Sequence, residues 1–295
     1  MKKIILVTGA TAGIGKATAL HLHAAGHQVI ATGRNEKALA ELKAAGLQAI
    51  ALDVTSQASI DAAKLEVDRL SSGHGLDVLV NNAGYGLFGP VEELSDADVR
   101  AQFDTNVFGL LAVTRAFVPA MRKRGSGRVI NVSSVGGRMV FPLGGVYHAT
   151  KFALEALTTA LRMELHQFGI RVSVIEPGYI KTEFTSTTMS LLRKYVRDDS
   201  PYAAALQVGA SAEEGLAGLA VGPESVARAI EHAATSRWPR ARYVAPFYNA
   251  AGPWLMRLLP TWLTDWAFRR ISGLNAAPRL VAPSSTEGAI ASRAT

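Results

Sequence analysis

The chain opens with KIILVTGATAGIGKATALHLHAAG (residues 3–26), in which an apolar run, a glycine-rich turn and an amphipathic stretch follow one another. Such a run, uninterrupted by charge, is typical of a strand covered on both faces, and the stretch after the turn suits a crossover helix. Repetition of this unit predicts an α/β fold, with a doubly wound parallel sheet of about seven strands and helices on both faces. The further strand-like runs are residues 28–33, 48–54, 76–82, 127–134, 170–177 and 241–247.

The composition is that expected of a soluble, cytoplasmic protein. The 295 residues include no cysteine, which excludes disulfides and a thiolate nucleophile and fits a reducing compartment. The first apolar run is about five residues long, too short for a signal peptide, and no stretch approaches the roughly 18 apolar residues of a membrane span.

No linker or internal repeat divides the chain, so we expect a single catalytic domain over residues 1–274. Residues 178–222 lack a clean periodicity and suit a substrate-covering loop with short helices. A C-terminal helical extension is expected at about 249–271, with Pro260 in the first turn of its last helix. The remainder, 275–295, is small and polar enough to form a flexible tail.

Positive charge is concentrated near the C-terminus. Between Arg237 and Arg279 the sequence has seven arginines against one acid, and all four tryptophans fall there. Because this basic balance is local, no binding to nucleic acid is expected. Large apolar residues at every fourth position favour a stripe packed against the sheet or a neighbouring subunit. The alternatives are a cover over the substrate pocket and peripheral contact with an anionic membrane. The stripe consists of Trp254, Leu258, Trp262 and Trp266.

The turn after the first strand, TGATAGIG (8–15), has the features of a pyrophosphate-binding loop. Gly9, Gly13 and Gly15 would permit a tight turn and a close approach of the backbone. The helix that follows would present its N-terminal amides to a phosphate. The spacing is GxxxGxG and differs from the GxGxxG of many dinucleotide-binding folds, so a turn without a ligand is the alternative.

The second strand ends in Thr32, Gly33, Arg34 and Asn35. In dinucleotide enzymes of this architecture an acid at this place holds the ribose 2′-hydroxyl of NAD, whereas an arginine accommodates the 2′-phosphate of NADP. No acid is present, and the guanidinium of Arg34 can bind a phosphate bidentately. NADP(H) is therefore predicted in preference to NAD(H). A solvated loop arginine is the alternative.

Several motifs occur together along the chain: TGATAGIG, NNAG (81–84), Ser134, Tyr147 and Lys151. In this combination the chain resembles the short-chain dehydrogenase/reductase family, and within it the hydroxysteroid and retinol dehydrogenases. The resemblance covers about residues 1–250. It implies a single Rossmann-type domain that carries both the cofactor and the substrate site, and an oxidoreductase that uses NAD(P)H.

The resemblance also implies the cofactor site, position by position. It implies a pyrophosphate turn, a pair that meets the adenine, a motif that borders the ribose and a segment that touches the nicotinamide. One departure is Ala12, where many NADP-preferring relatives have a basic residue, so the NADP(H) preference depends on Arg34. The expected cofactor-binding residues are Gly9, Thr11, Gly13, Ile14, Gly15, Arg34, Asp53, Val54, Asn82, Ala83, Gly84, Tyr147, Lys151, Pro177, Gly178, Ile180 and Thr182.

A carbonyl accepts hydride readily only when its oxygen is polarised and then protonated, so the protein must supply an acid. Tyr147 and Lys151 are four positions apart and lie on one face of the expected helix. We expect Tyr147 to act as general acid in reduction and general base in oxidation, while Lys151 lowers its pKa and holds the nicotinamide ribose. Ser134 would stabilise the developing alkoxide. The resemblance implies that Asn106 kinks its helix and holds a proton-relay water.

Residues that flank these motifs are mostly apolar, so a hydrophobic carbonyl or alcohol is the expected substrate. The family resemblance implies a homodimer or homotetramer built through the helices that contain Asn106 and Tyr147. A nucleotide-sugar epimerase or dehydratase and a non-catalytic NADP(H)-sensing protein are the alternative functions. No metal site is expected, since the histidines show no ligand spacing with acids or with one another. The flanking residues are Gly86, Leu87, Phe88, Met139, Val140, Phe141, Pro142, Leu143, Tyr179 and Phe184.

Overall fold

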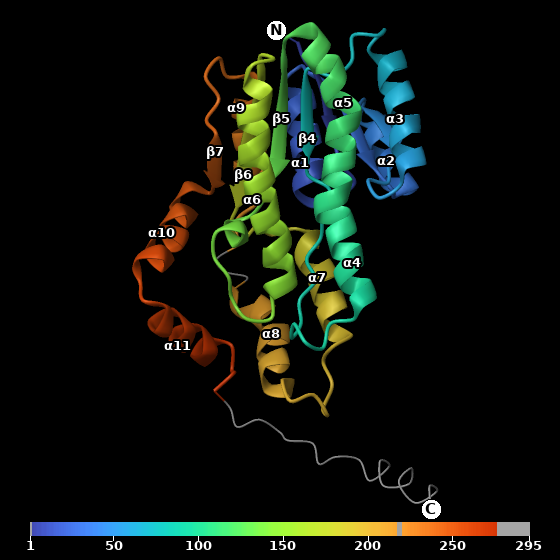
Figure 1. Cartoon of the computed structure of the whole chain (residues 1–295). Coiled ribbons are helices and arrows are strands. Elements are labelled where there is room, and N and C mark those ends of the chain that lie inside the picture. Colours follow the sequence, from blue (N-terminus) through green and yellow to red (C-terminus); the bar gives the residue numbers. More distant parts are fainter. Residues whose placement is uncertain (1, 217–219, 276–295) are drawn as a thin grey trace, which may run out of the picture.

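The computed structural model describes residues 2–216 and 220–275, with the side chains of 212–216 left out. Within these ranges the strands form one seven-stranded sheet in which all neighbours run parallel, which confirms the predicted fold class (Figure 1). Apart from Asn275, the expected tail (275–295) lies outside the described residues. In spatial order the strands are β3 (Gln48–Ala51), β2 (Gln28–Gly33), β1 (Ile4–Val7), β4 (Val78–Asn81), β5 (Gly127–Val132), β6 (Ile170–Pro177) and β7 (Arg242–Ala245).

Helices cover both faces of the sheet, because the strands bury apolar side chains on both sides. One face carries α1 (Gly13–Ala24), α2 (Glu36–Ala44) and α9 (Glu224–Thr235). The opposite face carries α3 (Gln57–Leu70), α5 (Leu110–Arg124) and α6 (Gly145–His166). A further helix, α4 (Asp96–Phe103), leads into α5 through a π-helical segment (Asp104–Gly109).

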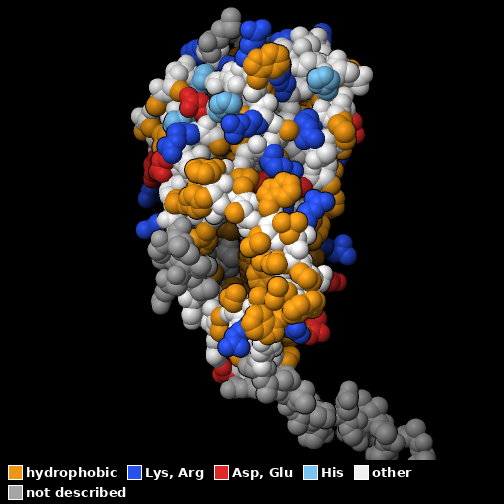
Figure 2. Space-filling view, turned by 90° about the vertical axis from the view of Figure 1, so that its left-hand side faces the viewer, with side chains coloured by type: hydrophobic (Ala, Val, Ile, Leu, Met, Phe, Trp, Pro, Cys, Tyr) orange, Lys and Arg blue, Asp and Glu red, His pale blue; other side chains and the backbone are white. Residues whose placement is uncertain are grey.

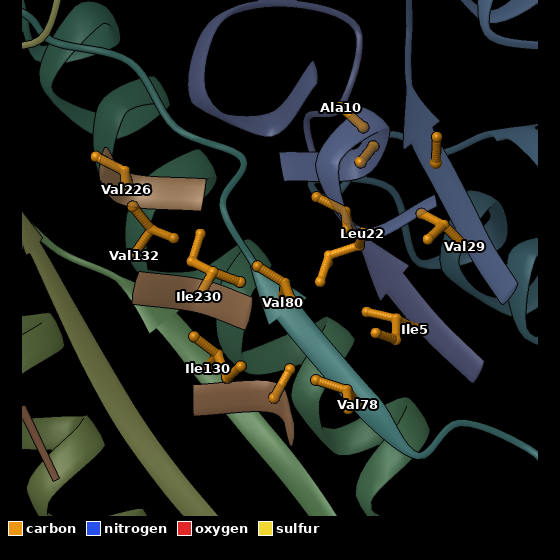
Figure 3. Close-up of a cluster of buried hydrophobic side chains, with 14 of the residues drawn as sticks. Ile5, Ala10, Leu22, Val29, Val78, Val80, Ile130, Val132, Val226 and Ile230 are labelled. Carbon is orange, nitrogen blue, oxygen red and sulfur yellow. The ribbon is translucent and has the colours of Figure 1, made fainter. Parts of the chain in front are cut away.

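Figure 3 shows the core between the sheet and the first of these layers. Leu22 of α1 and Ile230 of α9 point toward the strand residues Ile5, Val80 and Ile130, and all five side chains are fully buried. Burial of a side chain of this size contributes about 1.5–3 kcal/mol. This packing holds α1 against the sheet.

The winding of the sheet reverses between β1 and β4. The chain runs outward from β1 to β3 and then returns to pair β4 with the other edge of β1. In open parallel sheets, ligands bind beyond the carboxyl ends of the strands at such a point. The glycine turn after β1 and the NNAG motif after β4 meet here, which makes this edge the candidate site.

Helical segments lie beyond this edge (Figure 1). The expected substrate-covering segment contains two helices, α7 (Glu183–Arg193) and α8 (Ala203–Leu216). After β7 the chain forms α10 (Ala251–Leu258) and α11 (Thr261–Ile271). Pro260 lies at the N-cap of α11, one position before the first turn in which it was expected.

The tryptophan stripe does not pack against the sheet, so that part of its favoured prediction is wrong. Its four side chains are exposed, from 50% for Trp266 to 79% for Leu258. Both faces of the sheet are already covered by helices, and α10 and α11 leave the sheet beyond its last strand (Figure 1). In the described part of the chain, no helix is long and apolar enough to cross a bilayer.

Candidate active site

A single cleft beyond the carboxyl ends of the strands brings the expected site residues together. Its volume is about 1260 Å³. Every residue expected to bind the cofactor lines it, and so does Ser134, whereas Asn106 does not. Parts of α7, α8 and α11 complete its walls. Figure 2 shows a hollow bordered by hydrophobic side chains on the face of the molecule that carries α10 and α11.

The glycine turn is held in shape by the NNAG motif. The Asn82 side chain donates from Nδ2 to Thr8 O at 2.9 Å and to Gly9 O at 3.2 Å. The Thr8 hydroxyl accepts the backbone N–H groups of Asn82 and Ala83. Gly9 has a φ of +64°, and a Cβ on Gly15 would lie 2.2 Å from Gly9 O. Only glycine fits at these two positions, and the resulting turn leaves the backbone accessible to a pyrophosphate.

A carboxylate already binds at the N-terminus of α1. The N–H of Gly13 donates to Oε2 of Glu183, in the first turn of α7, at 2.9 Å. Thr182, the N-cap of α7, lies against the same glycine, because a Cβ on Gly13 would be 3.2 Å from Thr182 Cβ. An anionic oxygen thus lies where a cofactor phosphate oxygen is expected, so the turn fits a pyrophosphate. Glu183 was not expected from the sequence, where its only signal is its place directly after Thr182.

Glu183→Gln is expected to tighten NADPH binding about twofold to fivefold, the range of an exposed ionic interaction. The carboxylate competes with the pyrophosphate for the Gly13 N–H and repels it, whereas the neutral amide does so more weakly. Fluorescence titration of the purified protein with NADPH measures this without any substrate. Glu164→Gln, which neutralises an exposed acid on α6 outside the cleft, is the matched control. Unchanged or weaker NADPH binding by Glu183→Gln would contradict the competition.

Arg34 and Asp53 both line the cleft and form an ion pair there. Arg34 is 74% exposed, and its Nη1 lies 3.9 Å from Oδ2 of Asp53. The Thr55 backbone N–H and hydroxyl both donate to Oδ1 of Asp53. These hydrogen bonds, aided by the charge of Arg34, hold the pKa of Asp53 below its ordinary value. The cation predicted after β2 therefore lines the cleft beside an ionised carboxylate.

Tyr147 and Lys151 lie one turn apart in α6 and line the cleft together. The Nζ atom of Lys151 is 5.8 Å from the ring centroid of Tyr147 and donates to Val132 O, at the end of β5, at 3.1 Å. Ser134 follows the same strand, and its Oγ accepts the N–H of Gly136 at 3.0 Å. The packing of α6 beside the end of β5 is therefore what brings the three side chains together.

The pKa of Tyr147 shifts in the direction opposite to the one expected. Burial raises it to about 12, although Ser134 acts in the other direction. Burial also lowers the pKa of Lys151 to about 8, an effect that Glu155 partly offsets. The net lowering expected for the pKa of Tyr147 is thus not found for the protein's own groups, because desolvation of the phenol outweighs the effect of Ser134. Tyr147 is held protonated, as a proton donor must be.

Asn106 lies behind the cleft in the π-helical segment. Its Oδ1 accepts the N–H of Tyr85 at 3.1 Å, and its Nδ2 donates to Tyr85 O at 3.0 Å and to Thr150 Oγ1 at 3.1 Å. A Cβ on Gly84 would lie 3.0 Å from Asn106 Oδ1 and 3.9 Å from Lys151 Nζ. The amide of Asn106 therefore fixes the backbone that follows the NNAG motif next to Lys151.

Aromatic rings surround Tyr147. Phe88 stacks on it with a centroid distance of 5.5 Å, and Phe184 lies at 5.8 Å. Phe141 is 6.1 Å from Phe88 and packs edge-on against His148 at 4.2 Å. All of these rings line the cleft. Such an enclosure favours an apolar ligand next to the Tyr147 hydroxyl.

His148 joins the loop that carries Ser134 to α6. Its Nδ1 lies 2.8 Å from Gly136 O, and because a carbonyl oxygen can only accept, Nδ1 carries the proton. Burial lowers the pKa of His148 and keeps the ring neutral. The neutral side chain therefore ties the loop that carries Ser134 to α6, beside Tyr147.

A buried carboxylate with two partly exposed arginine partners lies next to the same loop. Glu176 of β6 is fully buried, and its carboxylate lies between Arg242 and Arg138, whose Nη1 is 3.6 Å away. Arg242 also donates to Glu155 of α6 at 2.7 Å. A buried carboxylate of this kind is stable only while its cationic partners stay in place. The cluster was not expected from the sequence, because its members come from segments far apart in the chain.

The segment after β7 also contributes to the cleft. Asn249 lies directly against Gly178, since a Cβ on that glycine would be 1.7 Å from Asn249 Nδ2. Tyr248, Ile271 and Ser272 line the cleft as well. None of these residues was named as a site residue from the sequence, although a cover over the substrate pocket was one alternative for the tryptophan stripe in the same segment.

The chain matches the family model described as short chain dehydrogenase over residues 3–191. It belongs to the short-chain dehydrogenase/reductase family of oxidoreductases, as the motifs implied.

Curated relatives extend over most of the chain. It is 37% identical to the uncharacterized oxidoreductase YbbO of Escherichia coli (strain K12) over 265 residues, which cover 90% of this chain and 93% of the relative. It is 34% identical to human (Homo sapiens) 17-beta-hydroxysteroid dehydrogenase type 6, over 91% of this chain and 88% of that protein. A 3-ketodihydrosphingosine reductase of Bacteroides thetaiotaomicron is 40% identical over 62% of this chain and 66% of its own length.

Solved structures show the same fold. A short-chain dehydrogenase from Streptomyces avermitilis superposes with a TM-score of 0.74 at 33% identity, covering 93% of this chain and 98% of that one. A serine dehydrogenase in complex with NADP+ superposes with a TM-score of 0.70 at 33% identity, covering 82% of this chain and 93% of that one.

Proposed function

We propose that this protein interconverts a hydrophobic carbonyl compound and the corresponding alcohol, with NADP(H) as the redox partner. The observation that carries the proposal is the joint presence of Ser134, Tyr147 and Lys151 in one apolar cleft with the glycine turn. The chemistry supplied by bound nicotinamide is hydride transfer. The residues of the chain that would hold the cofactor are those of the glycine turn, Arg34, Asp53, the NNAG motif, Lys151 and the segment Pro177–Thr182.

Tyr147 supplies the proton in reduction. Its raised pKa keeps the hydroxyl protonated at neutral pH, so it can donate to a carbonyl oxygen as negative charge develops there. Ser134 donates a second hydrogen bond to that oxygen and stabilises the charge. Lys151 holds the ribose of the cofactor and, as a cation beside the phenol, assists proton transfer. The amide of Asn106 holds the backbone of Tyr85, which follows Gly84 close to Lys151.

The substrate is an apolar molecule of some length. The rings of Phe88, Phe141 and Phe184 enclose the reaction centre, and apolar residues of α8 and α11 extend the wall. The names of two relatives refer to a 17-beta-hydroxysteroid and to 3-ketodihydrosphingosine, which supports a large lipid-like carbonyl or alcohol.

Arg34 is the basis for preferring NADP(H). Its guanidinium is exposed in the cleft, and the end of β2 has no acid that would repel a 2′-phosphate. A solved relative binds NADP+, which supports the same choice.

The protein acts as a homodimer or homotetramer. Phe108, Phe152 and Met163 are exposed, at 56%, 43% and 66%, on or next to the helices α5 and α6. Large apolar side chains of this kind at the surface favour burial in a contact between copies of the chain.

The test is consumption of NADPH with a panel of aliphatic, aromatic, steroid and long-chain carbonyls, followed by the absorbance of the reduced nicotinamide. We expect turnover with the long apolar carbonyls, and faster turnover with NADPH than with NADH. Tight NADPH binding without turnover on any carbonyl or alcohol would instead identify a cofactor-sensing protein.

The pH profile of the same assay has a defined expectation. Tyr147 stays protonated to about pH 12, whereas Lys151, with its pKa lowered to about 8, loses its charge above that pH. The rate of reduction should therefore be flat below pH 8 and fall above it, by up to about tenfold per pH unit. A rate that stays flat to pH 10 would remove the role of the Lys151 cation.

A further inference from the structure

The segment that follows β7 presents an unusual number of large apolar side chains to solvent. We call residues 247–271, which contain a 3-10 turn, α10 and α11, the C-terminal arm. Surfaces of soluble proteins seldom have extensive continuous apolar patches unless something covers them. The exposed side chains of the arm are Phe247 (82%), Tyr248 (54%), Trp254 (57%), Leu255 (56%), Leu258 (79%), Trp262 (69%), Trp266 (50%) and Ile271 (72%).

The charges of the arm are mostly positive. Arg257, Arg269 and Arg270 are exposed there, against the single carboxylate of Asp265. The guanidinium of Arg270 lies over the ring of Trp266, 5.9 Å from its centroid. Tryptophan with arginine, on short helices that cannot cross a bilayer, is the combination that rests at the surface of anionic lipid.

The arm also borders the mouth of the cleft. Tyr248 and Ile271 are exposed at the surface and at the same time line the cleft. Phe184 of α7 and Val208 of α8 are likewise exposed and line the cleft. The turn after α11 packs against α8, because a Cβ on Gly273 would lie 3.1 Å from Val208. Figure 2 shows hydrophobic side chains on the sides of this hollow.

The arm could be covered by a second copy of the chain or by a lipid bilayer, and its position at the mouth of the cleft favours the bilayer. A second copy of the chain packed rigidly on the arm would obstruct entry to the cleft. A bilayer would leave the mouth open to a fluid phase in which apolar molecules are dissolved. The positive charge also matches anionic headgroups, whereas two copies facing each other through the arm would bring like charges together.

We propose that the C-terminal arm docks on the surface of an anionic lipid bilayer, so that an apolar substrate passes between the membrane and the cleft. The proposal rests on the proposed function for the identity of that substrate. The docking itself needs no catalysis and is measured separately.

The test is flotation of the purified protein with vesicles of phosphatidylcholine alone and of phosphatidylcholine with phosphatidylserine. We expect binding to the mixed vesicles that weakens as salt is raised, and much weaker binding to the neutral ones. The double variant Leu258→Ser/Trp262→Ser should bind the mixed vesicles about tenfold or more weakly, since both side chains are highly exposed and neither lines the cleft. Arg269→Glu/Arg270→Glu should remove the preference for phosphatidylserine.

Trp238→Ser is the matched control, because Trp238 is 71% exposed but lies before β7, outside the arm. It should bind vesicles as the unmodified protein does. Absence of binding by the unmodified protein, or equal loss in Trp238→Ser, would overturn the proposal. A change of molecular mass in light scattering on Leu258→Ser/Trp262→Ser would do so too, since the arm would then cover a second copy. If the arm variants lose vesicle binding but keep turnover of a short, water-soluble carbonyl, docking and catalysis are separate properties. If no variant and not even the unmodified protein shows turnover, the proposed function fails, while the flotation result still tests docking.

Discussion

Tyr147→Phe should lower kcat/KM for carbonyl reduction by about 100-fold to 10,000-fold, the usual contribution of a general acid. The variant removes one oxygen and keeps the ring, so the stacking with Phe88 at 5.5 Å and the shape of the cleft are retained. We therefore expect the dissociation constant of NADPH to change by less than about threefold. Steady-state rates with the best substrate of the carbonyl panel, together with NADPH fluorescence titration, measure the two effects separately.

The matched control for this loss is Tyr202→Phe. The hydroxyl of Tyr202 donates to Glu92 outside the cleft, so its removal leaves the reaction centre untouched. Rates for this variant should equal those of the unmodified protein. Full turnover by Tyr147→Phe would show that the proton comes from elsewhere and would end the proposed mechanism.

Arg34→Asp should reverse the cofactor preference. A charge-assisted hydrogen bond contributes about 1.5–3 kcal/mol, so its loss weakens NADPH binding by about 10-fold to 150-fold. The new carboxylate repels the 2′-phosphate and can accept a hydrogen bond from the ribose 2′-hydroxyl of NADH. The ratio of kcat/KM values for NADPH and NADH measures the change directly, because substrate and reaction are the same for both cofactors.

Arg34→Lys is the control, since it keeps the charge and loses the planar, bidentate geometry. We expect it to keep a preference for NADPH that is weaker than that of the unmodified protein. The ion pair with Asp53 is long, at 3.9 Å, and Arg34 is largely exposed, so neither variant should unfold the protein. An unchanged cofactor ratio in Arg34→Asp would place the phosphate away from this residue.

The fold could be predicted because its signals are local. Each strand is a short apolar run covered by helices on both sides, and the periodicity of the intervening stretches marks the helices. The glycine turn and the pair Tyr147 and Lys151 are equally local. Spacing along a strand, a turn or one face of a helix fixes where such groups point, whatever the rest of the chain does.

The pKa values of these groups, and the contacts that distant segments make with them, are set by the tertiary structure. The pKa of Tyr147 depends on how much of the chain encloses the phenol, and here burial raises it despite the opposing effect of Ser134. The bond between Glu183 and Gly13 joins α7 to the glycine turn, and the buried Glu176 finds its arginines on other segments. Contacts of this kind leave no periodic trace in the sequence.

The sequence alone predicts the parallel sheet, the glycine turn at its edge and the side chains for proton transfer. The outward direction of the C-terminal arm and the apolar mouth of the cleft were set only in three dimensions. The same four-residue repeat of tryptophan and leucine suits a buried stripe as well as an exposed one. Which of the two forms depends on whether a sheet face is left to cover it, and here helices already occupy both faces.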